Sequence, residues 1–216
     1  MPELTKTPIT FALLAIIALV FGVEMLLGAP DNTAMLVKMG ATVPGTLELH
    51  EYWRLLAAMF LHANWLHWLV NSWALYQLGS LFEHLFGRGR FALVYFVTGI
   101  CASVASAAHT QGASVGASGA IFGILGAFIF SLRRSQWRHD PQTRGLNSQL
   151  VFWALINLAI GAKFAFIDNT AHIAGLVSGL VIGLLLPHRV PPPPPASHVI
   201  DVQPYDDSPL PPRDHP

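Results

Sequence analysis

The sequence predicts an all-α membrane protein whose chain crosses the bilayer six times. Hydrophobic residues make up 53% of the 216 residues and charged residues only 11%, whereas a soluble domain carries about 25% charged residues. The apolar residues also fall into blocks near the length of about 20 residues that a helix needs to cross a bilayer. The six blocks are 9–27, 55–81, 91–108, 116–132, 150–167 and 171–187.

The first blocks and their connections differ in character. Block 9–27 is expected to be a retained helix, because few charges precede it and no clear cleavage site with small residues comes before Gly28. Residues 28–53 are too many for a turn and mix apolar with polar side chains, so we expect part of this loop to lie in the membrane interface. Cys101, the single cysteine, falls in block 91–108 and is expected to be a buried, inert thiol.

The positions of the basic residues predict the orientation of the chain. If six helices alternate, most lysines and arginines fall on one side of the membrane and few on the other. The first group is Lys6, Arg88, Arg90, Arg133, Arg134, Arg138, Arg144 and Arg189, and the second is Lys38, Arg54 and Lys163. Since basic residues are enriched in cytoplasmic loops, both termini are predicted to be cytoplasmic.

Two regions are expected along the chain. Residues 1–189 would form the membrane domain, and residues 190–216 a proline-rich cytoplasmic tail that cannot bury a core and is expected to be disordered. The formal net charge of zero gives no reason to expect a nucleic-acid partner. The lipid bilayer is the partner that the composition requires.

The start of block 116–132 places Ser118 among small residues. Gly119 and Gly123 form a GxxxG pattern, which is typical of helix packing and explains much of this segment without chemistry. The preceding residues 109–114 are small and polar, and they cannot face lipid because their backbone groups would lack partners. They could instead line a water-filled cavity, and backbone N–H groups at a helix start suit a developing oxyanion.

Block 171–187 carries a histidine above a row of glycines. His172, Gly175, Gly179 and Gly183 share one helical face. If the glycine faces of this block and block 116–132 pack together, His172 meets Ser118. A histidine beside a serine is the arrangement that nucleophilic catalysis requires.

Block 55–81 supplies a third set of polar residues. His67 and Asn71 are four residues apart on one face, and His62 lies closer to the external end. Hydrogen bonds between helices would account for any one of these residues. The alternative is a set of donors aimed at developing negative charge.

Together these residues resemble the rhomboid family of intramembrane proteases, in its six-helix bacterial form. The motifs are His62-x4-His67-x3-Asn71, Gly116–Ala117–Ser118–Gly119 and Ala171–His172-x2-Gly175-x3-Gly179, with Trp53–Arg54 and Glu83-x3-Gly87-x2-Arg90. The similarity covers about residues 9–186, and the set is far more specific than any single motif.

The resemblance implies a serine endopeptidase that cleaves transmembrane segments of other membrane proteins near the external face. Ser118 would be the nucleophile and His172 the base of a dyad, without metal or cofactor. The Ser118 N–H, His67 and Asn71 would hold the oxyanion, with His62 nearby. The residues implied to be structural, or to stack on the histidine, are Phe122, Trp53, Arg54, Glu83, Arg90, Gly116, Gly119, Gly175 and Gly179.

Some positions qualify the resemblance. Many family members have a tyrosine at the position of Phe122, so a ring can still stack here but the hydroxyl is missing. Asp168 is predicted to be a helix N-cap rather than the third member of a triad. The fifth helix would be a lateral gate, with Phe152, Trp153 and Phe166 as gate residues.

Other functions remain open at this level. A non-catalytic protein of the same fold would bind transmembrane clients without cutting them, although the presence of both Ser118 and His172 favours the enzyme. A transporter that moves protons or metal ions along the histidines is a third possibility, but the sequence shows no matching pair of broken helices in its two halves. A metalloprotease is disfavoured because no His-Glu-x-x-His motif occurs. The expected location is a bacterial cell (inner) membrane, with several passes.

Overall fold

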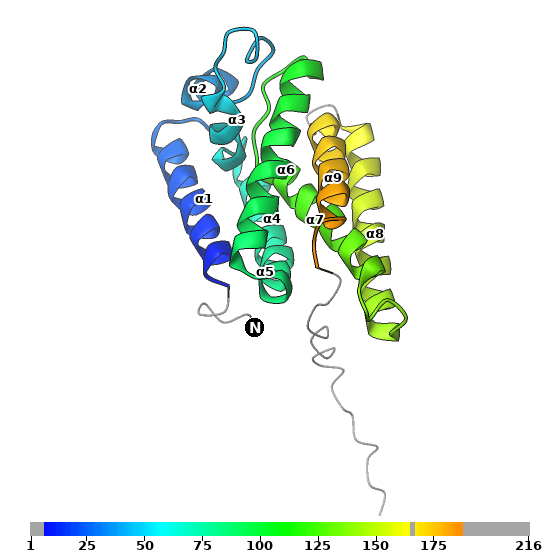
Figure 1. Ribbon diagram of the computed structural model, residues 1–216. Coiled ribbons are helices and arrows are strands. Elements are labelled where there is room, and N and C mark those ends of the chain that lie inside the picture. Colours follow the sequence, from blue (N-terminus) through cyan, green and yellow to red (C-terminus); the bar gives the residue numbers. More distant parts are fainter. Residues whose placement is uncertain (1–6, 165–166, 188–216) are drawn as a thin grey trace, which may run out of the picture.

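The computed structural model describes residues 7–164 and 167–187, and these residues form a bundle of helices (Figure 1). The elements are α1 (Pro8–Leu26), α2 (Thr33–Met39), α3 (Trp53–Ala57), η1 (Ala58–Phe60), α4 (Trp65–Ala74), η2 (Leu75–Gly79), α5 (Ser80–Phe86), α6 (Arg88–His109), α7 (Ser118–Arg134), α8 (Pro141–Lys163) and α9 (Asn169–Gly183). Within these ranges the one pairing of strand type is an isolated bridge between Thr42 and Ser114. The all-α prediction is confirmed for this part of the chain. The predicted tail 190–216 and the predicted gate residue Phe166 lie outside the described residues.

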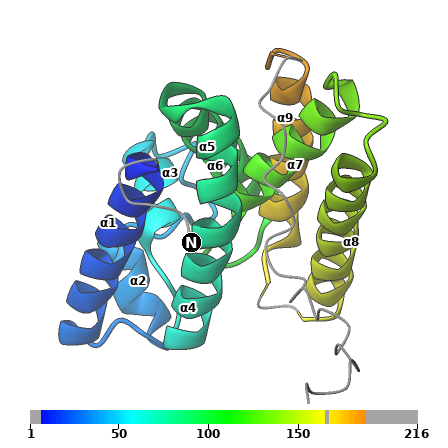
Figure 2. The same cartoon turned by 90° about the horizontal axis from the view of Figure 1, so that it is seen from below.

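Helix α7 is the centre of the bundle. Thirteen of its 17 residues are buried, and it lies between α6 and α9, with α8 outside them (Figure 2). Small residues allow this close approach: a Cβ atom added at Gly175 or Gly179 of α9 would overlap the carbonyl oxygen of Gly119 or Gly123 of α7. The glycine faces of the two helices therefore pack against each other, backbone to backbone.

The predicted second span, 55–81, is wrong at its start. The chain forms α3 and η1, leaves the helix at Leu61, and begins α4 only at Trp65. The side chain of Asn64 caps α4 by accepting a hydrogen bond from the N–H of His67 at 2.9 Å. A hydropathy block cannot reveal this break, because Leu55, Leu61 and Trp65 are apolar on both sides of it, whereas the N-cap residue is a local start signal.

The predicted start of the fifth span, at residue 150, is also wrong. Helix α8 begins at Pro141, because Asp140 caps it through the N–H of Thr143 (2.8 Å) and proline suits the first helical turn. The remaining limits differ by a few residues. Cys101, expected to be buried, is exposed on the surface of α6.

Three of the described helices, α1, α6 and α8, are long and apolar enough to cross a membrane. The run from α4 through η2 to α5 is divided by π-helical geometry, and α7 and α9 have 17 and 15 residues. Large apolar side chains such as Leu19 and Leu155 are exposed on the outer helices, at 71% and 62%. The protein is therefore a multi-pass membrane protein by composition and surface, while the count of six spans and the side of the termini stay predictions.

Two residues predicted to be structural satisfy helix ends far from Ser118. The Glu83 carboxylate of α5 accepts hydrogen bonds from the N–H groups of Ile9 and Thr10 (3.0 and 2.8 Å) and from the Thr10 hydroxyl (2.7 Å). These N–H groups open α1 and have no partner within the helix. Arg90 donates to the carbonyl oxygen of Phe86 at 3.0 Å, at the end of α5.

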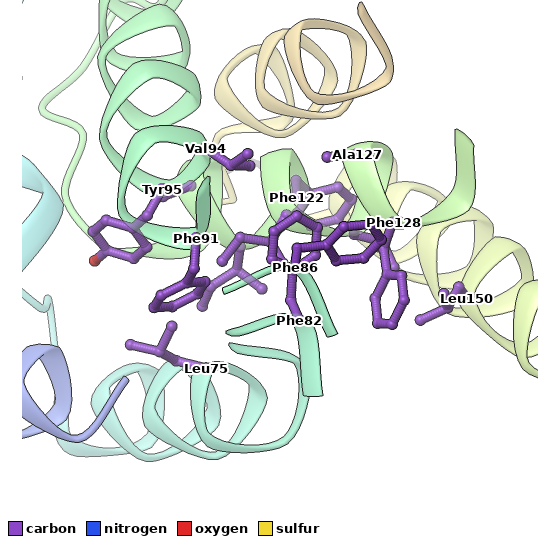
Figure 3. Packing of buried hydrophobic residues seen from close by; sticks show 14 of the residues in the cluster. Leu75, Phe82, Phe86, Phe91, Val94, Tyr95, Phe122, Ala127, Phe128 and Leu150 are labelled. Atoms are coloured by element: carbon purple, nitrogen blue, oxygen red, sulfur yellow. The ribbon is translucent and has the colours of Figure 1, made fainter. Parts of the chain in front are cut away.

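An aromatic cluster joins α5 to the far half of α7 (Figure 3). The ring of Phe82 lies 4.5 Å from that of Phe86 and 5.6 Å from that of Phe128, measured between centroids. All three side chains are buried. In the half of α7 that follows the glycine contacts, large apolar side chains thus hold the helix in place. Burial of each one stabilises the fold by roughly 1.5–3 kcal/mol.

The contact between α7 and α9 yields a prediction. Gly179→Ala is expected to lower the free energy of unfolding by about 1–3 kcal/mol, because the added methyl group has no room against the Gly123 carbonyl. The measurement is the thermal unfolding midpoint in detergent. Gly22→Ala in α1 is the matched control, since a Cβ there meets nothing within 4 Å; an equal effect of both variants would contradict the close packing.

Candidate active site

Ser118 and His172 lie within hydrogen-bonding distance. The Oγ atom of Ser118 is 2.9 Å from Nε2 of His172, although the two residues are 54 positions apart. Ser118 is the first residue of α7, and His172 lies in the first turn of α9. The glycine contacts between these helices set the distance, since Gly119, next to Ser118, meets Gly175, which lies three residues after His172. A serine hydroxyl that donates to imidazole Nε2 is a nucleophile with a base in reach.

Ser118 and His172 lie inside the bundle, at some depth from the end that the last residues of α6 form. Ala102 of α6 faces Gly119, because a Cβ on that glycine would lie 2.5 Å from the Ala102 Cβ. Helix α6 continues to His109 beyond this level, which at 1.5 Å per residue is about 10 Å. The chain then returns through residues 110–117 before α7 begins (Figure 1). This irregular segment is pinned by the bridge of Ser114 to Thr42 and by a 2.8 Å hydrogen bond from Gly116 N–H to the Ala58 carbonyl.

Phe122 lies one turn after Ser118 and stacks on His172. The two rings are 4.3 Å apart with an angle of 11° between their planes. The Nδ1 atom of His172 is buried and has no hydrogen-bond partner among the described residues. The imidazole is therefore held by ring packing on one side and by Ser118 at Nε2.

The first turn of α7 has no side-chain cap. Its backbone bonds begin with Ile121 N–H to the Ala117 carbonyl (3.0 Å), so the N–H groups before Ile121 come too early in the helix to bond within it. The positive end of the helix dipole adds to their field. This helix start can stabilise an anion beside the Ser118 hydroxyl.

His67 lies against the backbone just before Ser118. Gly116 has φ +121°, and a Cβ there would be 2.7 Å from both Cε1 and Nε2 of His67, so only glycine leaves room for this ring. The Ala63 N–H points to Nδ1 of His67 at 3.4 Å. Since Nδ1 accepts, the neutral ring carries its proton on Nε2, the atom next to Gly116.

Asn71 follows His67 by one turn of α4 and is 4% exposed. Its Nδ2 donates to the His67 carbonyl at 2.9 Å, which uses one of its two amide hydrogens. The second hydrogen is available to a ligand, and Oδ1 has no partner in the described part of the chain. His67 and Asn71 thus offer one donor each.

His62 does not extend this set of donors directly. Its ring is fully buried between Phe21 and His67, with centroid distances of 6.5 and 5.2 Å. Its backbone N–H donates to Oε1 of Glu24 at 2.8 Å. Glu24, which is also fully buried, ties α1 to the turn before α4. This tie was missed in the sequence, although a lone carboxylate near the end of an apolar span was a signal.

Trp53 and Arg54 hold the loop above the site. Arg54 pairs with Glu51 at 2.7 Å and donates to the carbonyl oxygens of Val37 and Ala41, and its guanidinium lies 4.7 Å from the Trp53 ring centre. The Trp53 ring also occupies the space that a side chain at Gly40 would need.

Asp168 caps α9, as predicted, through the N–H of Ala171 at 3.0 Å. The same carboxylate accepts hydrogen bonds from Ser106 of α6, from Thr110 just after the end of α6, and from Ser114 (2.5, 3.3 and 2.7 Å). These three hydroxyl residues were not expected to contribute; the spacing of Ser106 and Thr110 by four residues was the available signal. Burial raises the pKa of the Asp168 carboxyl, but the four hydrogen bonds outweigh burial and leave the pKa below its usual value.

Comparisons with known proteins show which family the chain resembles. A family model described as a rhomboid domain matches residues 49–189. Rhomboid protease GluP of Bacillus subtilis is 37% identical over 81% of this chain and 34% of its own length. RHOMBOID-like protein 1 of Arabidopsis thaliana is 38% identical over 74% of the chain and 41% of its own length, and Rhomboid-like protease 2 of Toxoplasma gondii 34% over 76% and 56%. The chain therefore matches about a third to a little over half of these relatives.

The Asp168 carboxylate gives a second prediction. Asp168→Ala is expected to lower the unfolding midpoint more than Asp140→Ala. Both variants remove an N-cap, which costs about 0.5–2 kcal/mol, but Asp168→Ala also removes the carboxylate to which three hydroxyl groups donate. Since the folded pKa of Asp168 is lowered, its stabilisation is present above the unfolded pKa of about 4 and is lost as the pH falls through the lower folded value. Thermal unfolding from pH 7 to pH 3 would test this; equal midpoints for the two variants, or a difference that grows toward pH 3, would contradict it.

Proposed function

Because the chain belongs to the rhomboid family, we propose that it is an intramembrane serine endopeptidase that cleaves transmembrane segments of other membrane proteins with Ser118 and His172. The observation that carries this proposal is the 2.9 Å contact between Ser118 Oγ and His172 Nε2 at the starts of two packed helices. A relative that only binds its clients has no need for this geometry.

In the proposed reaction, Ser118 Oγ attacks the scissile carbonyl carbon while its proton passes to Nε2 of His172. The tetrahedral intermediate collapses as the imidazolium returns this proton to the leaving amine, which gives an acyl-enzyme. Water then attacks the ester, with His172 again as the base. The backbone N–H of Ser118, Nε2–H of His67 and the free amide hydrogen of Asn71 stabilise the oxyanion.

The substrate is proposed to be a transmembrane helix that unwinds near the dyad. A peptide bond in a regular helix is shielded because its N–H and C=O groups are hydrogen-bonded along the axis. Small or helix-breaking residues lower the cost of unwinding by roughly 1 kcal/mol for glycine and 3 kcal/mol for proline. Helix α8 is the proposed lateral gate, because Phe152 and Trp153 are exposed on it and it lies outside the α6–α7–α9 core (Figure 2).

Replacement of the dyad is the direct test. Ser118→Ala and His172→Ala are each expected to abolish cleavage of a transmembrane substrate in liposomes, with the unfolding midpoint of Ser118→Ala near that of the parent protein. Ser178→Ala is the matched control, because this serine of α9 donates only to the Gly175 carbonyl (2.9 Å) and should leave cleavage unchanged. Cleavage retained by Ser118→Ala would refute the nucleophile.

The oxyanion donors make a graded prediction. Asn71→Ala is expected to lower kcat by about 10²–10³, which corresponds to roughly 2.7–4 kcal/mol, with little change in KM, because the lost hydrogen bond forms only in the transition state. Asn157→Ala is the control, since Asn157 also donates to the carbonyl four residues earlier, at 2.8 Å, but on the exposed face of α8. An equal loss in both variants would mean that Asn71 contributes only to its helix.

A further inference from the structure

A cavity of about 150 Å³, lined by polar residues together with Leu132, lies between the end of α7 and the first turns of α8, far from Ser118. Three arginines line it, Arg133, Arg138 and Arg144, together with the donors Thr143, Asn147 and Ser148. The site is built from two helices and their connection, and it has no part in the proposed chemistry. Its lining is strongly cationic and carries no carboxylate.

Among the residues that the structure describes, no carboxylate neutralises the positive charge of this cavity. Residues 133–148 hold four arginines and one acidic residue, Asp140. The Asp140 carboxylate already accepts hydrogen bonds from the N–H and the hydroxyl of Thr143, at 2.8 and 3.2 Å. Among the described residues, neither Arg138 nor Arg144 forms an ion pair. Cations gathered in this way repel one another unless an anion lies between them.

Two neighbouring arginines are held by other contacts. Arg134 donates to the Leu184 carbonyl at the end of α9, so its guanidinium is directed away from the cavity. Arg133 donates through Nε to Oδ1 of Asn147 at 3.2 Å, which links α7 to α8. Its terminal N–H groups remain available, and Arg138 and Arg144 are both exposed.

The surroundings of the cavity indicate which kind of anion would fit it. It lies at the end of α7 opposite Ser118, where α7 and α8 meet at the lower edge of Figure 1. Trp137, in the connection, is of the residue type enriched at the level of lipid headgroups. One turn after Ser148, α8 turns apolar and exposed, with Phe152 59% accessible. A cationic cavity that adjoins an exposed apolar surface along α8 matches the two halves of a phospholipid.

We propose that this cavity binds the phosphate headgroup of an anionic phospholipid, with its acyl chains along the exposed face of α8. Arginine suits this role because its planar guanidinium donates two hydrogen bonds to one phosphate. Basic pockets between membrane helices are suited to such headgroups. The bound phosphate bridges α7 and α8 at this end of α8.

Native mass spectrometry in detergent tests the site without reference to cleavage. The intact protein is titrated with phosphatidylglycerol and with phosphatidylcholine of the same acyl chains. We expect the anionic lipid to bind at least about tenfold more tightly, and Arg138→Gln with Arg144→Gln to abolish this preference. Equal affinity of the two lipids, or an unchanged preference in the double variant, would overturn the proposal.

Matched variants and a soluble competitor separate the remaining explanations. Arg138→Lys with Arg144→Lys keeps the charge and should keep most of the preference. Lys38→Gln with Lys163→Gln removes two cations elsewhere and should also keep it; loss of the preference there would reveal general attraction and overturn the site. Glycerol phosphate should not displace the lipid at equal concentration, and displacement would assign the cavity to a free phosphate ester instead. Thermal unfolding confirms that each variant is folded.

Discussion

The backbone contact between α7 and α9 is the constraint on which the rest of the structure depends. Gly119 and Gly123 of α7 touch Gly175 and Gly179 of α9 so closely that a methyl group at either α9 position would overlap a carbonyl oxygen. Ser118 and His172 lie immediately beside the first of these pairs, and their 2.9 Å distance follows from the packing. Without a hydrophobic effect between helices in lipid, such close packing supplies the attraction itself. The contact that holds the bundle together is therefore also the one that assembles the dyad.

A second constraint is that polar groups inside an apolar bundle need partners. Three carboxylates each join two or more segments. The buried Glu83 holds the start of α1 to α5, and the buried Glu24 holds α1 to the turn before α4. The half-buried Asp168 joins α9 to α6 and to the loop before Ser118. The irregular stretches 61–64 and 110–117 are possible only because neighbouring segments take up their backbone groups, such as Gly116 N–H bonded to the Ala58 carbonyl. These stretches also carry the groups that surround Ser118, so irregular backbone occurs where the chemistry is proposed.

These two constraints explain which features were predictable from sequence. Glycine spacing and the positions of Ser118 and His172 define helix faces, and faces that must pack can be paired without coordinates. The N-cap role of Asp168 was equally local. The break between η1 and α4 was not predictable from hydropathy, because Leu61 is as apolar as a continuous span requires. The spacing of Ser106 and Thr110 placed their hydroxyls on one face of a helix, but that Asp168 is their partner, together with Ser114, follows only from the return of the chain into the bundle. Exposure of Cys101 likewise depends on which face of α6 is covered.

The surroundings of His172 bear on how the proposed base would work without a third carboxylate. Asp168 is one turn away along the chain, but its oxygens are occupied by four donors and the Nδ1 atom of His172 has no partner among the described residues. A carboxylate would orient the ring and stabilise its charged form; here the Phe122 face, stacked 4.3 Å from the imidazole, fixes the ring plane and presents electron density to an imidazolium. The attraction of a cation to a ring is worth about 0.5–2 kcal/mol, less than a buried charge pair can provide. In the proposed reaction, such a dyad would depend more heavily on the oxyanion donors, and the confined position of His67 over Gly116 suits that role.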